Sequence, residues 1–127
     1  MRIISFAWTT PALLARQKSV TRRDWKYDYA KTFKAGENLQ AWNKNPRLKH
    51  YPRFMARKVG EIQLREDPYL EPLAEVPLAD WVEEGFEYLQ SHGYKIDGIA
   101  PIDLWNGWKI SDESRWVNRF EIVSLEG

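Results

Sequence analysis

Residues 18–25 read Lys18-Ser19-Val20-Thr21-Arg22-Arg23-Asp24-Trp25, and this stretch decides how the N-terminal half of the chain folds. Its central branched side chains favour a β-strand, which we expect over residues 19–25. Side chains alternate between the two faces of a strand, so Thr21 and Arg23 share one face and Arg22 lies on the other. The side chains of Thr21 and Arg23 are then about 6–7 Å apart, a spacing suited to flanking a carbonyl or a phosphate.

Lys18 adds an amine to this group under one condition. It precedes Thr21 by three residues, so in a continuous strand its side chain would point to the opposite face. A turn before the strand would remove that restriction. The sequence therefore predicts a convergence of amine and hydroxyl only if Lys18 lies in such a turn.

The rest of the chain alternates between short strands and helices. Further strands are expected at residues 2–8, 38–42, 57–65 (with a bulge at Gly60) and 116–123. Short helices are expected after a cap at Thr9 or Thr10, at residues 27–33 as an alternative to a plain connection, and at residues 102–108. The clearest helix spans residues 78–90, and prolines keep residues 68–77 extended. This order predicts a single α+β domain over residues 1–127, a small β-barrel or strongly curved mixed sheet with two or three flanking helices.

Composition excludes several classes of protein. The 127 residues contain no cysteine and two histidines, which excludes a disulfide framework and a thiolate metal site, so we expect neither metal nor cofactor. No stretch approaches the ~20 apolar residues that cross a bilayer. We therefore expect a cytoplasmic protein with no membrane partner, and the oligomeric state stays open.

Charge is divided unevenly along the chain. Residues 1–65 contain 15 Lys and Arg and 4 acidic residues, a net charge of +11, whereas residues 66–127 contain 4 and 14, a net charge of −10. Either the halves pair as ordinary surface charge, or a basic face binds a polyanion. Residues 43–58 favour the second alternative, since they hold six Lys and Arg, no acid, and the rings of Tyr51 and Phe54. Lys49 and Arg53 of this segment are predicted substrate contacts.

Six short motifs along the chain match one family in order. They are Ser5-Phe6-Ala7-Trp8, Leu13-Leu14, the Lys-x-x-Thr-x-Arg element of residues 18–23, Phe33-Lys34-Ala35-Gly36-Glu37, Glu84-Gly85-Phe86, and Arg119-Phe120-Glu121-Ile122-Val123. Together they resemble the ASCH domain, a branch of the PUA-like superfamily. The resemblance implies a PUA-like β-barrel with helices beside a cleft that binds RNA or a modified nucleoside.

One group within this family is similar to the chain at its chemistry. These small amidohydrolases remove the acetyl group from the exocyclic amine of acetylated cytidine, and their Lys, Thr and Glu triad falls on Lys18, Thr21 and Glu84. Arg23 matches their following arginine, whereas Arg16 stands where the family often has glycine. Other ASCH proteins imply two alternatives, a non-catalytic single-stranded RNA-binding module and a metal-independent ribonuclease.

For amide hydrolysis, Thr21 would attack the carbonyl or position a water that attacks it. A threonine hydroxyl needs a neighbouring base, and Lys18 serves if burial and the nearby arginines lower its pKa. A carboxylate at Glu84 would raise that pKa instead. Glu83 and Glu84 project about 100° apart on a helix, so only one of them faces a cleft.

Aromatic and basic side chains would complete the substrate site. Arg22 and Arg23 are predicted substrate contacts, with Arg23 stabilising the oxyanion. A base-binding pocket needs an aromatic wall, which we assign to Trp8 or Trp25. Metal-free RNA cleavage would instead use Lys18, Arg22 or His50 for proton transfer.

Overall fold

A computed structural model describes residues 1–47 and 55–126 of the chain. The predicted contacts Lys49 and Arg53 and the alternative base His50 lie outside the described residues. Within the described ranges, six strands form one sheet: β1 (Ile3–Ser5), β2 (Val20–Arg23), β3 (Asn38–Trp42), β4 (Lys58–Leu64), β5 (Tyr69–Pro72) and β6 (Ser114–Leu125).

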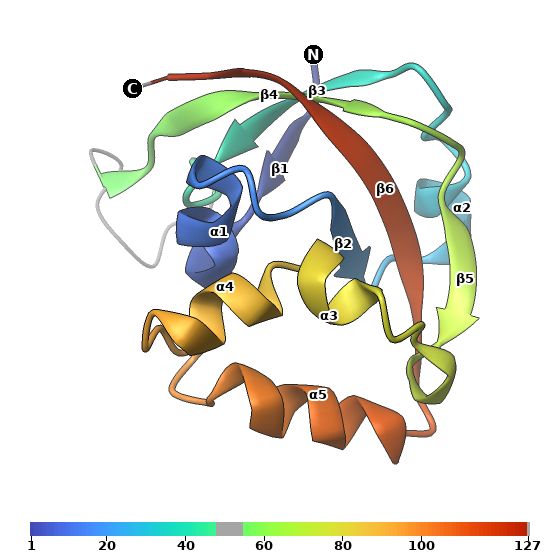
Figure 1. Ribbon diagram of the computed structural model, residues 1–127. Helices are drawn as coiled ribbons and strands as arrows, with labels where there is room; N and C mark the ends of the chain where they lie inside the picture. Colours follow the sequence, from blue (N-terminus) through green and yellow to red (C-terminus); the bar gives the residue numbers. More distant parts are fainter. Residues whose placement is uncertain (48–54, 127) are drawn as a thin grey trace.

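The sheet runs in the order β1-β3-β4-β6-β2, with β5 also paired to β6. β1 is parallel to β3, and the other pairs are antiparallel. The long β6 pairs with β2 and β5 through its first half and with β4 through its second half. It therefore joins both parts of a sheet that curls into a half-barrel (Figure 1). The predicted α+β class with a strongly curved mixed sheet is confirmed.

Alternating burial explains the strands that face the core. In β3, Leu39 and Ala41 are buried, whereas Asn38 is exposed, the period-two pattern of a half-buried strand. The register of β4 shifts beside Gly60, where a Cβ would meet the backbone oxygen of Ser124 at 2.3 Å. The predicted bulge at this glycine is confirmed, and glycine is required there by close backbone approach.

Seven short helical segments connect the strands. They are η1 (Ala7–Thr9), α1 (Thr10–Leu14), α2 (Tyr27–Ala30), η3 (Leu73–Glu75), α3 (Asp80–Glu83), α4 (Phe86–Ser91) and α5 (Pro101–Lys109) in the described chain. Helices α1, α3, α4 and α5 gather on the open side of the curled sheet (Figure 1). The described residues include no helix long and apolar enough to span a membrane.

The predicted continuous helix over residues 78–90 is wrong. Gly85 adopts a φ of +88° and separates α3 from α4. A left-handed residue ends a helix, and glycine adopts this conformation without a Cβ penalty. Glu84 therefore lies at the C-terminal cap of α3 rather than in a helix interior. Two smaller differences are that residues 7–9 form a 3₁₀ turn instead of extending the first strand, and that residues 68–77 contain β5 and η3.

Two hydrophobic cores meet at α1. The sheet core includes Phe6, Leu13 and Phe120, and the core of the helical layer includes Ala12 and Phe86. Adjacent residues of α1 thus pack into different cores. The turn after α1 and the break between α3 and α4 lie where these two layers meet.

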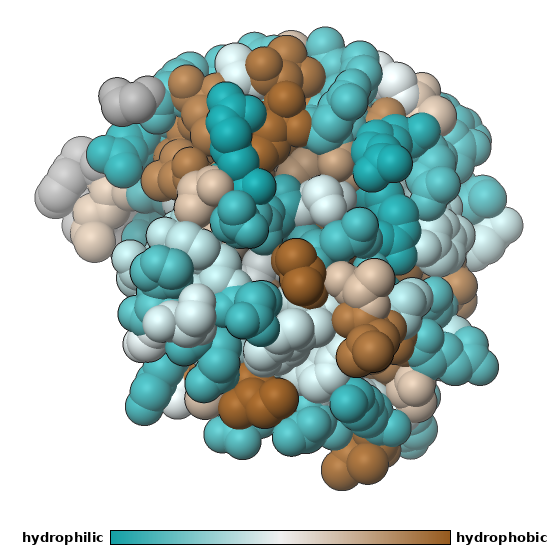
Figure 2. Space-filling view, viewed as in Figure 1, coloured by the Kyte–Doolittle hydropathy of each residue, from teal (hydrophilic) through white to brown (hydrophobic). Residues whose placement is uncertain are grey.

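Hydrophilic residues cover most of the face in Figure 2, and hydrophobic ones appear as separate spots and one larger group in the upper part of the view.

Candidate functional site

The turn between α1 and β2 places Lys18 against α3. Arg16 adopts a left-handed φ of +59° in this turn. The backbone N–H of Ser19 then donates to the carbonyl oxygen of Glu83 at 2.8 Å. Lys18 therefore precedes the strand, as its convergence with Thr21 requires.

Lys18 and Glu84 form a buried ion pair. The Lys18 ammonium donates to the Glu84 carboxylate oxygen Oε1 at 3.0 Å and to the Glu84 carbonyl oxygen at 2.8 Å. Their side chains are 1% and 4% exposed. Glu83 instead accepts from Arg119 at 2.8 Å, so Glu84 is the acid that faces the lysine.

Arg22 is held by three carboxylates. Its guanidinium donates to Oε2 of Glu84 at 2.6 Å, to Oε1 of Glu71 at 2.8 Å and to Oδ2 of Asp80 at 2.5 Å. The Arg22 side chain is 1% exposed. Because one Glu84 oxygen binds Arg22 and the other binds Lys18, the carboxylate is fixed in a single orientation.

The ion network continues away from Lys18 through Asp80. This buried carboxylate also accepts two hydrogen bonds from Arg119, at 3.0 and 2.9 Å, and Arg119 contacts the hydroxyl of Tyr69 at 3.0 Å. Sequence analysis missed Glu71, Asp80 and Arg119 as partners of the site. The acidic second half of the chain was the available signal, and part of that charge does pair with the basic first half.

Thr21 and Arg23 meet on the other face of β2. The Arg23 Nε donates to the Thr21 hydroxyl oxygen at 3.1 Å, and its Nη2 donates to the carbonyl oxygen of Ser5 at 2.6 Å. Thr21 is buried, at 5% exposure. A cation that donates to a hydroxyl oxygen favours the ionised form of that hydroxyl.

The cations of the site have shifted pKa values. Burial lowers the pKa of Lys18 and outweighs the opposing effect of Glu84, with Arg23 and Arg22 adding to the decrease. Burial also lowers the pKa of Arg23, to about 10, so this guanidinium remains charged at neutral pH. For Arg22, burial is outweighed by Glu84 and the other carboxylates, which raise its pKa.

A small cavity of about 220 Å³ brings the predicted polar residues together. Its lining includes Lys18, Thr21, Arg22, Arg23 and Glu84. Rings border the same space: the half-exposed Trp8 of η1, together with Trp108 of α5. Five of the polar residues predicted for the site, and the predicted aromatic residue Trp8, therefore line one cavity.

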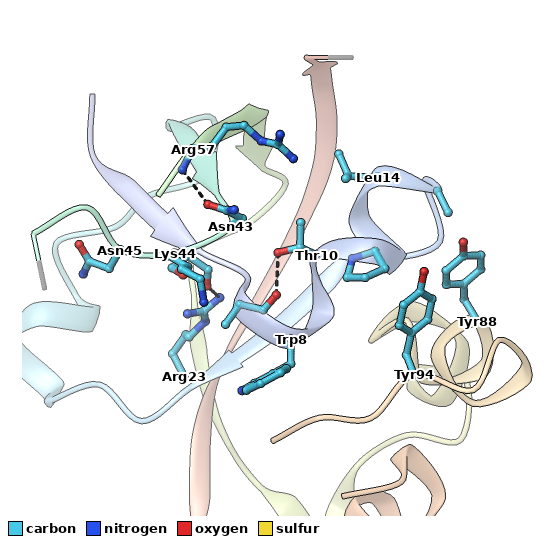
Figure 3. Close-up of a pocket in the computed structure, with 14 residues that line it drawn as sticks. Trp8, Thr10, Leu14, Arg23, Asn43, Lys44, Asn45, Arg57, Tyr88 and Tyr94 are labelled. Atoms are coloured by element: carbon cyan, nitrogen blue, oxygen red, sulfur yellow. Dashed lines mark hydrogen bonds between the residues drawn. The ribbon is translucent and has the colours of Figure 1, made fainter. Parts of the chain in front are cut away.

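A second cavity of about 1100 Å³ adjoins the first. Both cavities are lined by Ser5, Ala7, Trp8 and Arg23. The larger one extends past β3 and β4 on one side and α4 on the other (Figure 3). Sequence analysis assigned no role to Tyr88 and Tyr94, which line it.

Trp25, one of the two residues predicted to form the aromatic wall, lines neither of these two cavities. Its ring stacks on Phe33 with centroids 4.5 Å apart and meets Tyr29 edge-on at 5.4 Å. Three aromatic residues close in sequence pack together here, and Trp25 rests against the sheet core. Trp8, the other residue predicted for that wall, lines both cavities. As for metal, no group of three or more His, Cys, Asp and Glu side chains in the described ranges could hold an ion.

Comparison with known proteins supports the fold. The chain is similar to protein EF3133 from Enterococcus faecalis V583, whose crystal structure carries the family-model description DUF984. The TM-score is 0.57 at 14% sequence identity, covering 94% of this chain and 72% of that chain. No family model and no curated protein matches the sequence. At this identity, the likeness shows a shared curled-sheet fold.

Proposed function

We propose that this protein is an amidohydrolase that removes an acyl group from the exocyclic amine of a modified nucleoside such as acetylated cytidine. One observation carries the proposal: the buried Lys18–Glu84 pair and the Thr21–Arg23 pair line the same small cavity. The proposal also rests on the resemblance of these positions to ASCH-domain amidohydrolases.

Lys18 supplies the base. Its lowered pKa increases the neutral fraction of the amine, which accepts the proton of the Thr21 hydroxyl. The Thr21 oxygen then bonds to the acyl carbon, and the C–N bond breaks. The proton on Lys18 passes to the leaving exocyclic amine. Water hydrolyses the resulting ester, which releases the carboxylate and restores the threonine.

Glu84 and Arg23 have separate roles in this scheme. Glu84 orients Lys18 through two acceptors, its side-chain and main-chain oxygens. Arg23 donates to the Thr21 oxygen and stabilises the negative charge that develops there and on the acyl oxygen. Trp8 and Trp108 provide apolar surfaces against which a planar base can lie.

The proposal is tested by incubating the purified protein with acetylated cytidine and measuring cytidine and acetate. We expect both products in equal amounts, and a loss of at least about 100-fold in kcat/KM for Lys18→Met, since a general base contributes 10²–10⁴-fold. Lys34→Met is the matched control, because Lys34 is an exposed lysine whose side chain is 63% exposed.

Incubation of the protein with unmodified single-stranded RNA distinguishes the two alternative functions. Unmodified single-stranded RNA that is bound but not altered would indicate a non-catalytic RNA-binding module. Shortened RNA fragments formed in the presence of a chelator would indicate a metal-independent ribonuclease. Full deacetylase activity in Lys18→Met would overturn the proposed role of the lysine.

A further inference from the structure

Hydrolysis of a free nucleoside does not require the large cavity that lies beside the small one. Small-molecule sites commonly occupy about 300–1,000 Å³. The large cavity alone, at about 1100 Å³, lies just above that range. Its volume therefore exceeds what one acyl group or base would fill.

The two sides of this cavity differ in chemistry (Figure 3). Asn43, Lys44, Asn45 and Arg57 come from the region between β3 and β4, and Arg23 from β2 adds a further cation. Across from them, the cavity is bordered by α4 and the residues after it. Trp8 and Thr10 lie between the two sides. A cationic side facing an aromatic side suits a ligand that has phosphate at one edge and a ring at the other.

The aromatic side consists of Tyr88 and Tyr94. Their rings lie within 20° of parallel, with centroids 6.4 Å apart. Tyr94 is 43% exposed, so its ring is accessible. Stacking on such rings tolerates any base, because every base has a π-face.

The cationic side favours an anion. Among the described residues that line the cavity, Arg23, Lys44 and Arg57 are charged and no Asp or Glu is present. Arg57 is positioned by Asn43, whose side-chain oxygen accepts from the Arg57 backbone N–H at 2.7 Å and whose N–H donates to the Arg57 carbonyl at 3.0 Å. These contacts fix the backbone at the start of β4 and leave the guanidinium to the cavity.

We infer that this cavity binds the nucleotide that flanks the modified nucleoside, so that the substrate is part of a single-stranded oligonucleotide. The inference rests on the proposed function and names its substrate class. Trp8 and Arg23 line both cavities, so a strand whose modified base enters the small cavity continues directly into the large one. The flanking phosphate then contacts the cations, and the flanking base stacks on the exposed ring of Tyr94, since Tyr88 already stacks on His92 with centroids 4.0 Å apart.

The test compares kcat/KM for free acetylated cytidine with that for a trinucleotide carrying acetylated cytidine between two uridines. We expect the trinucleotide to be preferred by about tenfold or more, the effect of stacking one base. Arg57→Ala and Tyr94→Ala should each reduce this preference several-fold. Arg65→Ala is the matched control, because Arg65 is an exposed arginine that follows the opposite end of β4. A deoxyribose version of the trinucleotide determines whether the sugar contributes.

A second measurement separates this inference from the proposed function. Binding of the unmodified trinucleotide is followed by calorimetry at two salt concentrations, with wild-type protein and Arg57→Ala. If nothing is hydrolysed but binding weakens with salt and with Arg57→Ala, the cavity assignment stands and the amidohydrolase proposal fails. If the nucleoside is hydrolysed as efficiently as the trinucleotide, and the unmodified trinucleotide does not bind, the cavity assignment is overturned and the proposed function stands.

Discussion

Arg22 and Arg23 are neighbours on β2, yet their surroundings are opposite. Arg22 donates to Glu71, Asp80 and Glu84, which raise its pKa. Arg23 donates to a hydroxyl and a backbone carbonyl, and burial lowers its pKa to about 10. The charge of Arg22 is thus neutralised by its contacts, whereas that of Arg23 remains available at the edge of two cavities.

This difference assigns the two side chains to different tasks. A buried cation surrounded by carboxylates positions them, and its removal leaves them unpaired. A partly buried cation that contacts a hydroxyl, and that has no carboxylate hydrogen bond among the described residues, attracts a developing negative charge. We therefore assign Arg22 to the stability of the site and Arg23 to its chemistry.

The largest expected effect is on stability, in Arg22→Met. This variant should lower the free energy of unfolding by about 3–5 kcal/mol, because breaking a buried ion pair leaves uncompensated charge. Urea denaturation at pH 7 measures it. Arg65→Met should stay within about 0.5 kcal/mol of wild type. A loss in Arg22→Met no greater than in that control would remove the distinction between the two arginines.

Arg23→Met should affect the reaction more than the fold. We expect kcat/KM for acetylated cytidine to fall by about 100-fold, as for the loss of one oxyanion donor. Its free energy of unfolding should fall by less than that of Arg22→Met, since no carboxylate hydrogen bond is broken. Unimpaired hydrolysis in Arg23→Met would show that Arg23 does not stabilise the oxyanion.

Gly85→Ala should disturb the Arg22 environment but not the contacts of Arg23, because Gly85 fixes the position of Glu84, which binds Arg22 and Lys18. The φ of +88° is unfavourable for alanine by about 1–2 kcal/mol. The added Cβ would also lie 2.6 Å from Cβ of Ala12, so a backbone shift is required. Gly107→Ala is the matched control: nothing lies within 4 Å of that Cβ, and alanine favours the helix. Equal stability and activity in the two variants would show that the left-handed turn is dispensable.

The smallest effect is a shift in the pH profile. In the proposed mechanism Lys18 acts as a neutral amine, so kcat/KM should rise with pH and level off above the pKa of Lys18. Burial lowers that pKa from 10.5, so the rise should be centred below this value. Arg23 contributes to the decrease, so the rise in Arg23→Met should move to higher pH. A rise centred at or above 10.5 in wild type would argue against Lys18 as the base.

Local sequence patterns correctly predicted the structural elements whose formation depends on residues close together in the sequence. The strand at residues 38–42 follows from alternation, and the bulge from a glycine in a strand. Trp25 shows the limit of such patterns. Its place in the strand pattern does not reveal that the chain turns after Arg23 and packs this ring on Phe33.

The break at Gly85 and the ion network depend on long-range contacts. A single glycine costs a helix only about 1 kcal/mol, so helical periodicity over residues 78–90 hid the break. Arg22 meets Glu71 because β6 pairs with both β2 and β5. No sequence spacing reveals that pairing. The pairing of Lys18 with Glu84 was predicted from the family resemblance. Local sequence patterns could not have predicted it, because 66 residues separate the two positions.

The most direct test of the account is the rate of acetylated cytidine hydrolysis by Thr21→Val. Valine preserves the branched shape in β2 and removes only the hydroxyl that Arg23 contacts. The account predicts a fall of at least about 100-fold in kcat, with the far-ultraviolet circular dichroism spectrum unchanged. A folded Thr21→Val protein that hydrolyses the substrate at the wild-type rate would contradict it.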